Sequence, residues 1–201
     1  STLMRILSGF LQPISGEIYV DGKETVLDPY KAKELGIVLV PQELNLVEPL
    51  RVYENIFLGD EPTGRFLIDK KKMIQDASEI IKNLDVDIDP MELVERLSTG
   101  KKQMVEIMKA LSRSVKILIM DEPTAALSKR ECEELYQITE QLRGEGKSII
   151  FISHRLEDMY RLADRVTVFR DASYIGTWDI KDVTNETLVQ AMVGREIKDL
   201  Y

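Results

Sequence analysis

The feature that most constrains the fold is an apolar stretch, residues 117–120, that ends abruptly in two adjacent carboxylates, Asp121 and Glu122. An unbroken apolar run of strand length is typical of a central parallel strand that is covered on both faces. Because ligands of such sheets bind beyond the carboxyl ends of the strands, both acids are expected at a binding edge. A divalent cation or a protonatable substrate would offset the repulsion between them. The same residues also fit a solvated turn.

Two further apolar runs, residues 36–40 and 148–152, end in polar side chains as well. Gln42 follows the first run, and Ser153 and His154 follow the second. Buried strands joined by helices predict an α/β protein with a parallel sheet between helical layers. Because parallel neighbours bring their carboxyl ends to one edge, we expect Gln42, the two acids and His154 to lie together there.

These side chains suit the hydrolysis of a phosphoanhydride. Asp121 would hold Mg²⁺ directly or through water, and Glu122 would orient or deprotonate the attacking water. Gln42 and His154 would bind the metal, the water or the terminal phosphate. Taken alone, His154 also fits a loop histidine whose hydrogen bonds are satisfied within the protein and which has no catalytic role. Only its position after a buried strand favours the functional interpretation.

Residues 42–114 contain no further apolar strand, and their apolar side chains recur with helical spacing. Amphipathic helices are predicted over residues 70–84 and 98–111, with the methionines of the second filling the core. The change of pattern predicts an inserted α-helical subdomain at residues 42–114, on a core formed by residues 1–41 and 115–201.

Shorter elements are expected elsewhere in the chain. A capping box, Ser128 with Glu131 three residues later, opens a helix that Gly144 and Gly146 end. The other predicted elements are an initial helix, a hairpin of residues 17–21 and 24–27, helices at residues 30–35, 156–162 and 186–193, and strands at residues 165–170 and 174–178.

Charge and cysteine content limit the function further. The formal net charge is −8, so the chain lacks the basic surplus that non-specific nucleic-acid binding needs, and no nucleic-acid partner is expected. Cys132 is the only cysteine, which excludes an intrachain disulfide and favours a reducing compartment. No run approaches the roughly twenty apolar residues of a membrane-spanning helix, so any membrane association would come through a partner.

Two stretches are candidates for binding phosphate. A phosphate loop reads G-x-x-x-x-G-K-[ST] and continues into a helix, with its final hydroxyl on Mg²⁺. Ser1 and Thr2 match the end of that pattern, although Ser and Thr also simply cap helices. Within residues 95–103, a loop of small residues opens onto the helix at 98–111, where backbone amides bind anions and Lys101 and Lys102 would reinforce the site. A plain helix cap is the alternative here too.

In their order and spacing, these motifs together resemble those of an ATP-binding cassette ATPase. The residues that carry the resemblance are Ser1, Thr2, Gln42 and the segments 97–100, 118–124 and 152–154. The segments 42–46, 53–59, 103–107 and 192–196 are similar to the monosaccharide importers of the ribose, galactose and xylose type. Those importers fuse two cassettes in one polypeptide, and this chain resembles the first cassette without its phosphate-loop segment.

The resemblance implies a P-loop NTPase (RecA-like) α/β fold, with a parallel-sheet core, an antiparallel β edge and an inserted α-helical subdomain. It implies that ATP and Mg²⁺ bind. The implied catalytic residues are Glu122, His154 and Gln42, the implied metal ligands are Ser1, Gln42 and Asp121, and the implied phosphate contacts are Ser1 and Thr2. Without the Gly and Lys of the phosphate loop, the 201-residue chain alone is expected to be inactive.

Ser98, Thr99 and Gly100 resemble the signature segment that closes over ATP held by an opposing cassette. This chain departs from the general pattern, which has Gly at Thr99 and Gln at Lys101. Ala172 likewise stands where the family commonly has a turn glycine, a residue that adopts positive φ at no cost.

The resemblance also implies partners and a location. The implied partners are a second cassette, fused or dimeric, transmembrane permease subunits and, indirectly, a sugar-binding protein. The implied location is the cytoplasmic face of the cell membrane, and the implied function is to power monosaccharide import. A nucleotide-binding regulatory half with little hydrolysis, or a soluble cassette ATPase without a transport role, are the alternatives.

Overall fold

Three parallel strands organise the first part of the computed structural model, which describes residues 2–64 and 67–194. They are β3 (Ile37–Val40), β4 (Ile117–Asp121) and β5 (Ser148–Ile152), with β4 in the middle. The register places Val40 opposite Met120, and Asp121 opposite Ile152. The predicted parallel sheet is therefore confirmed, and its three strands end at one edge.

The chain forms two compact units, Ser1–Ile152 and Ser153–Tyr201. Besides the three strands, the first unit contains α1 (Thr2–Leu7), β1 (Tyr19–Val20), β2 (Lys23–Glu24), α2 (Pro29–Glu34), α3 (Val52–Ile56), α4 (Lys70–Asn83), the 3-10 turn η1 (Val94–Arg96), α5 (Thr99–Leu111) and α6 (Lys129–Gly144). The second unit contains α7 (Leu156–Leu162), β6 (Arg165–Arg170), β7 (Ser173–Asp179), the 3-10 turn η2 (Ile180–Asp182) and α8 (Asn185–Val193).

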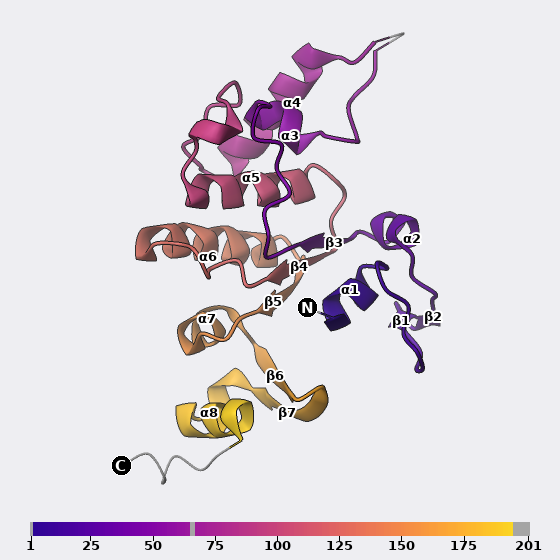
Figure 1. Ribbon diagram of the computed structural model, residues 1–201, viewed down its shortest axis with the longest axis vertical. Coiled ribbons are helices and arrows are strands. Elements are labelled where there is room, and N and C mark those ends of the chain that lie inside the picture. Colours follow the sequence, from indigo (N-terminus) through magenta and orange to yellow (C-terminus); the bar gives the residue numbers. More distant parts are fainter. Residues whose placement is uncertain (1, 65–66, 195–201) are drawn as a thin grey trace. The chain divides into compact units, whose positions relative to one another are not determined.

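Both faces of the three-stranded sheet are covered, which explains why its strands are apolar at every position except Ser148 and Asp121. Side chains alternate between the two faces of a strand. Val38, Leu118 and Met120 pack in one cluster with side chains of α3, α4, α5 and α6. Ile37 and Ile119 face the opposite cluster, which includes side chains of α1 and α2. Figure 1 shows α5 and α6 on one side of the three strands and α1 on the other.

The long helices follow their predicted spans closely. Asp69 caps α4 by accepting the N–H of Lys72 at 3.0 Å, and Met73, Ala77 and Ile81 form its buried face. The hairpin β1–β2 is antiparallel as predicted, but its second strand is Lys23–Glu24, shorter and earlier than residues 24–27. The helix α3 was not predicted, because five residues are too few to show a helical period.

The second unit pairs β6 and β7 in an antiparallel hairpin against α8, with Val166, Val168 and Leu188 in its core. Asp171 and Ala172 form its turn with φ angles of 50° and 60°. The chain therefore adopts the left-handed conformation at Ala172 without the glycine that is common there.

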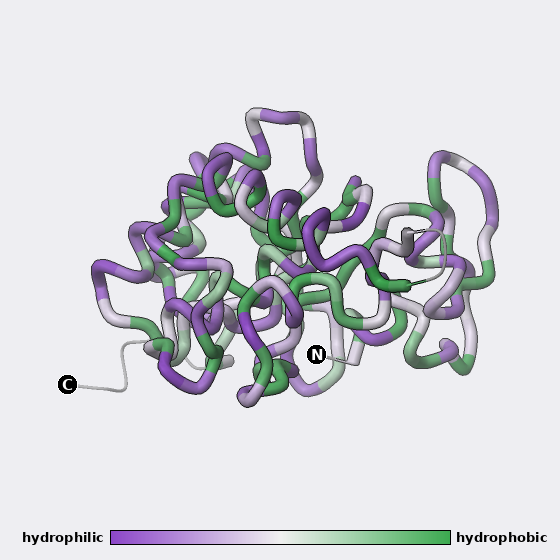
Figure 2. The backbone as a smooth tube through the Cα atoms, turned by 90° about the horizontal axis from the view of Figure 1, so that it is seen from above, coloured by the Kyte–Doolittle hydropathy of each residue, from purple (hydrophilic) through white to green (hydrophobic). Residues whose placement is uncertain are grey.

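None of the helices in the described parts of the chain is long and apolar enough to span a membrane. Figure 2 shows hydrophobic and hydrophilic residues alternating at short intervals along the backbone. The predicted division into a core and a helical subdomain at residues 42–114 stays a prediction.

Candidate functional site

Asp121 lies at the carboxyl end of the central strand β4 and is 7% exposed. Its Oδ1 atom is buried and has no hydrogen-bond partner within residues 2–64 and 67–194. Leaving a buried carboxylate oxygen unsatisfied is costly, and a bound cation would remove that cost. Among the described residues, no group of three or more His, Cys, Asp or Glu side chains forms a metal cage. The single buried carboxylate is compatible with Mg²⁺, which commonly binds one or two carboxylates together with water and substrate phosphates.

Glu122, the next residue, has a φ angle of 47°, which is unusual for a residue with a side chain. Its N–H donates to the carbonyl of Ile152 at 3.0 Å, so pairing with β5 helps to hold this conformation. Such a backbone costs on the order of 1–3 kcal/mol and persists where surrounding contacts fix it. The turn directs the chain out of the sheet directly after Asp121.

Gln42 comes from the end of the neighbouring strand β3 and meets Glu122. The Nε2 atom of Gln42 donates a hydrogen bond to Oε2 of Glu122 at 3.4 Å. Gln42 is exposed and Glu122 half-buried, so both side chains have access to solvent. The structure thus brings together two of the three predicted catalytic residues, next to the predicted metal-binding acid.

The start of α5 contains the predicted phosphate-contacting residues Ser98, Thr99 and Gly100. Ser98 caps the helix by accepting the N–H of Lys101 at 3.3 Å, and Thr99 is exposed. Ser98 Oγ also donates to Oε1 of Glu131, at the start of α6, at 3.2 Å. A Cβ atom on Gly100 would collide with that Glu131 carboxylate, so only glycine allows this close approach.

Glu131 also forms the predicted capping box of α6. Its Oε2 atom accepts the Ser128 N–H at 2.9 Å and the Ser128 hydroxyl at 2.7 Å. These bonds lower the pKa of Glu131, first through the Ser128 amide and hydroxyl and then through Ser98 and Gly100. The sequence indicated the capping box and the small-residue stretch, but not that one carboxylate joins them.

His154 belongs to the second unit, as the second residue after β5. Ser153 Oγ donates to Asp158 at 2.5 Å and accepts the Arg155 N–H at 2.9 Å, which fixes the backbone on both sides of the exposed His154. The position of His154 close to Asp121 and Glu122 stays a prediction. Thr2 is exposed at the start of α1, and Ser1 lies outside the described residues.

Sequence reasoning missed Glu106, a carboxylate on the buried face of α5 that is only 5% exposed. Its Oε1 atom accepts the N–H of Asn45 at 2.6 Å. Burial raises the pKa of Glu106, against the opposing effects of Lys109 and the Asn45 amide. The sequence contained one signal for this buried carboxylate, which is a charged residue between Val105 and Ile107 on an amphipathic helix.

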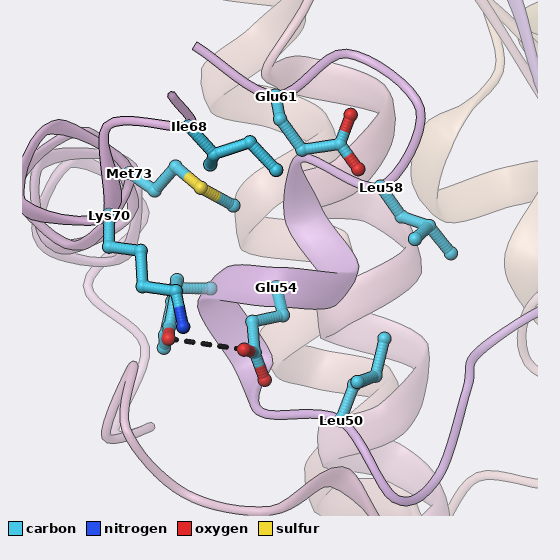
Figure 3. Close-up of a pocket in the computed structure, with 8 residues that line it drawn as sticks. Leu50, Glu54, Leu58, Glu61, Ile68, Lys70 and Met73 are labelled. Atoms are coloured by element: carbon cyan, nitrogen blue, oxygen red, sulfur yellow. Dashed lines mark hydrogen bonds between the residues drawn. The ribbon is translucent and has the colours of Figure 1, made fainter. Parts of the chain in front are cut away.

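A pocket of about 160 Å³ lies beside α3 and the start of α4, and its lining contains none of the predicted site residues. Figure 3 shows Leu50, Leu58, Ile68 and Met73 around it, together with Glu54. Most of its lining is therefore apolar, with carboxylates at Glu54 and Glu61 and an ammonium group at Lys70.

Comparison with known proteins identifies the fold. The ADP conformation of MJ1267, an ATP-binding cassette of an ABC transporter, has a TM-score of 0.82 at 24% identity, covering 96% of this chain and 83% of that chain. The dimeric post-hydrolysis state of the cassette MJ0796, bound to ADP and Pi, has a TM-score of 0.73 at 23% identity, covering 89% of this chain and 79% of that chain. The chain therefore has the predicted P-loop NTPase fold of ATP-binding cassettes.

The family model described as ABC transporter matches residues 1–125, and the chain belongs to this family. The arabinose import ATP-binding protein AraG of Vibrio parahaemolyticus is 46% identical over 203 residues, which are 100% of this chain and 40% of that protein. The ribose import ATP-binding protein RbsA of Clostridium perfringens is 44% identical over 204 residues, 100% of this chain and 41% of that protein. The chain thus spans about two fifths of the length of these curated relatives.

Proposed function

We propose that this chain is the ATP-binding and ATP-hydrolysing part of a protein that powers monosaccharide import through a membrane permease. The strongest support is the acidic edge of the sheet, where Gln42 meets Glu122 next to the buried oxygen of Asp121. Relatives named for ribose and arabinose import, at 44% and 46% identity, support the choice of sugar as cargo.

In this proposal Asp121 holds Mg²⁺ through its buried oxygen, and Ser1 and Gln42 contribute further oxygen ligands. Mg²⁺ would supply the charge neutralisation that phosphoryl transfer requires. Glu122 orients the attacking water and accepts its proton. The hydrogen bond from Gln42 keeps the Glu122 carboxylate at the strand ends, where the water would be held.

The remaining predicted residues are assigned to two different ATP molecules. Thr2 and His154 contact the phosphates of the ATP bound by this cassette. Ser98, Thr99 and Gly100 contact the ATP of a second cassette, fused or dimeric, through the amides and hydroxyls at the start of α5. Closure of the two cassettes excludes water from both sites, and opening after hydrolysis drives the transport cycle.

The permease is proposed to contact the helical subdomain at residues 42–114. The pocket in Figure 3 suits this role, because its apolar lining and its charged side chains Glu54, Glu61 and Lys70 complement a short segment with apolar side chains and charges of both signs. The cassette would then lie at the cytoplasmic face of the membrane, and a sugar-binding protein would contact the permease.

The test is ATP-dependent sugar uptake by vesicles that contain the full-length protein and its permease. Asp121→Asn is expected to lower uptake of ribose or arabinose about 100-fold, while the protein still co-purifies with the permease. The matched control is Asp76→Asn, on the surface of α4, which removes an ion pair with Lys72. Wild-type uptake in the Asp121 variant, or co-purification with nucleic acid and no permease, would contradict the proposal.

A further inference from the structure

One carboxylate, that of Glu131, lies at the starts of two helices, α5 and α6. Its Oε1 atom accepts the Ser98 hydroxyl at 3.2 Å at the start of α5, and its Oε2 atom accepts the Ser128 N–H at 2.9 Å at the start of α6. The Gly100 amide is a further donor to this carboxylate. Helix starts attract negative charge, because their first N–H groups have no partner within the helix. Glu131 therefore occupies the position at α5 that an anion from another molecule would take.

The missing side chain of Gly100 is what brings the carboxylate so close to the backbone of α5. A Cβ atom at Gly100 would lie 2.0 Å from Oε1 of Glu131 and 2.2 Å from its Cδ atom. Gly100 is buried, whereas Ser98 beside it is exposed. The space next to the glycine, through which a phosphate would approach the helix start, is thus taken by the carboxylate.

The Ser98 hydroxyl has a single proton, and it is directed at Glu131. Ser98 Oγ accepts the Lys101 N–H at 3.3 Å and donates to Glu131 Oε1. A hydroxyl can donate only one hydrogen bond, so it cannot donate to Glu131 and to a phosphate oxygen at the same time. Binding of a phosphate by the Ser98 hydroxyl therefore requires that Glu131 release this bond.

The two lysines in the first turn of α5 are paired with acids of other segments. Lys101 Nζ lies 3.7 Å from Oδ2 of Asp87, and Lys102 forms an ion pair with Glu48. The positive charge that was expected to reinforce an anion site here is thus shared with two other carboxylates. An incoming phosphate would meet the negative charge of Glu131 with that much less compensation.

We propose that Glu131 is a built-in competitor that phosphate must displace before the ATP of a second cassette engages Ser98 and Gly100. The inference rests on the proposed function, in which these residues contact that ATP, and it adds what regulates the contact. Two anions cannot share the same donors without repulsion. The Ser128 bonds can remain when those to Ser98 and Gly100 break, so the displaced carboxylate stays at the start of α6.

A purely structural role for Glu131 predicts the opposite effect on nucleotide binding. If the carboxylate only fixed the two helix starts, its loss would leave Ser98 less well placed and would weaken the contact with ATP. If the carboxylate competes with phosphate, its loss strengthens that contact. Glutamine has the size of glutamate and also suits the third position of a capping box, so Glu131→Gln removes the charge and retains the cap.

The test measures nucleotide affinity of the full-length protein, with a non-hydrolysable ATP analogue and with ADP. The proposed closure over ATP ends after hydrolysis, so ADP reports binding without the contact to α5. Glu131→Gln is expected to lower the Kd for the analogue at one of the two sites about tenfold and to leave the Kd for ADP unchanged. Glu131→Asp, whose carboxylate reaches one methylene less far from α6, should lower the analogue Kd by a smaller factor, and it remains informative if Glu131→Gln does not fold.

Glu134→Gln is the matched control, because it removes the same charge from α6 one turn later, where Glu134 pairs with Arg130. This variant should bind both nucleotides like the wild type. Unchanged or weaker binding of the analogue by Glu131→Gln would overturn the inference, and so would an equal gain in affinity for ADP. A wild-type protein that binds neither nucleotide would instead contradict the proposed function itself, so the two failures are distinguishable.

Discussion

Gln42 donates a hydrogen bond to Glu122 at 3.4 Å and so joins the ends of two adjacent parallel strands, β3 and β4. This contact depends on the register of the sheet, since Val40 lies opposite Met120 and each polar residue follows within two positions. A glutamine and a glutamate 80 residues apart in sequence are thereby placed at one edge. The buried oxygen of Asp121 completes an arrangement suited to a metal ion and a water molecule.

The close approach of α5 to Glu131 predicts that Gly100→Ala is destabilising. A Cβ there would displace the Glu131 carboxylate and break its bond with Ser98, which is expected to lower the free energy of unfolding by about 1–3 kcal/mol. Urea denaturation measures the change. Gly144→Ala is the matched control, because a Cβ at Gly144 meets no atom and improves helix propensity. If both variants were equally stable, the contact with Glu131 would carry no weight.

The turn between β6 and β7 predicts the opposite effect for Ala172→Gly. The φ angle of 60° at Ala172 costs a residue with a Cβ about 1–2 kcal/mol, partly offset by the greater freedom of glycine in the unfolded chain. A net stabilisation of about 0.5–1 kcal/mol is therefore expected in thermal or urea unfolding. Ala163→Gly, at a φ of −86°, has no such strain to relieve and should be destabilising. A loss of stability in Ala172→Gly would show that the turn is unstrained.

The carboxylates of Glu106 and Glu131 are expected to change the free energy of unfolding with pH in opposite directions. Burial raises the pKa of Glu106 in the folded protein, so the ionised carboxylate lowers the free energy of unfolding at pH values above that pKa. This loss disappears at low pH, where the carboxyl group is protonated in both the folded and the unfolded state. Glu106→Gln should therefore gain stability relative to the wild type as the pH rises from about 4.5 to about 8. Urea unfolding at several pH values measures the difference. A difference that does not vary with pH would contradict the assignment.

Glu131 provides the comparison. The Ser128 hydrogen bonds lower its pKa, so its stabilisation is present above the unfolded-state value and is lost as the pH falls through the folded-state value. Glu131→Gln should therefore lose stability relative to the wild type as the pH rises through the lowered folded-state pKa to the unfolded-state value of about 4.5, with little further change above that value. The same sign for both variants would show that one of the two environments is misassigned.

Much of the fold is predictable from sequence, because residues 37–40, 117–120 and 149–152 are apolar throughout and two helices have clear apolar faces. The short helix α3 is not, since five residues carry no period. The meeting of Gln42 and Glu122 follows from parallel strands with shared ends.

Contacts between side chains of distant elements are harder to predict. The hydrogen bond from Ser98 to Glu131 joins the start of α5 to the capping box of α6. Each of these two motifs can be recognised from its own residues, and neither one indicates a contact with the other. The hydrogen bond from the Asn45 N–H to Glu106 depends on how the loop around Asn45 packs against α5. A charge on an apolar helix face indicates that a partner exists, but not which backbone group it is.

The central claim is that Glu122 acts on the water that attacks ATP, and the rate of hydrolysis by the full-length Glu122→Gln variant tests it most directly. The amide keeps the size of the side chain but cannot accept the proton, so kcat should fall at least about 100-fold while ATP still binds. Glu134→Gln, which affects an exposed ion pair with Arg130 on α6, should hydrolyse ATP like the wild type. Hydrolysis by Glu122→Gln at the wild-type rate would contradict the account.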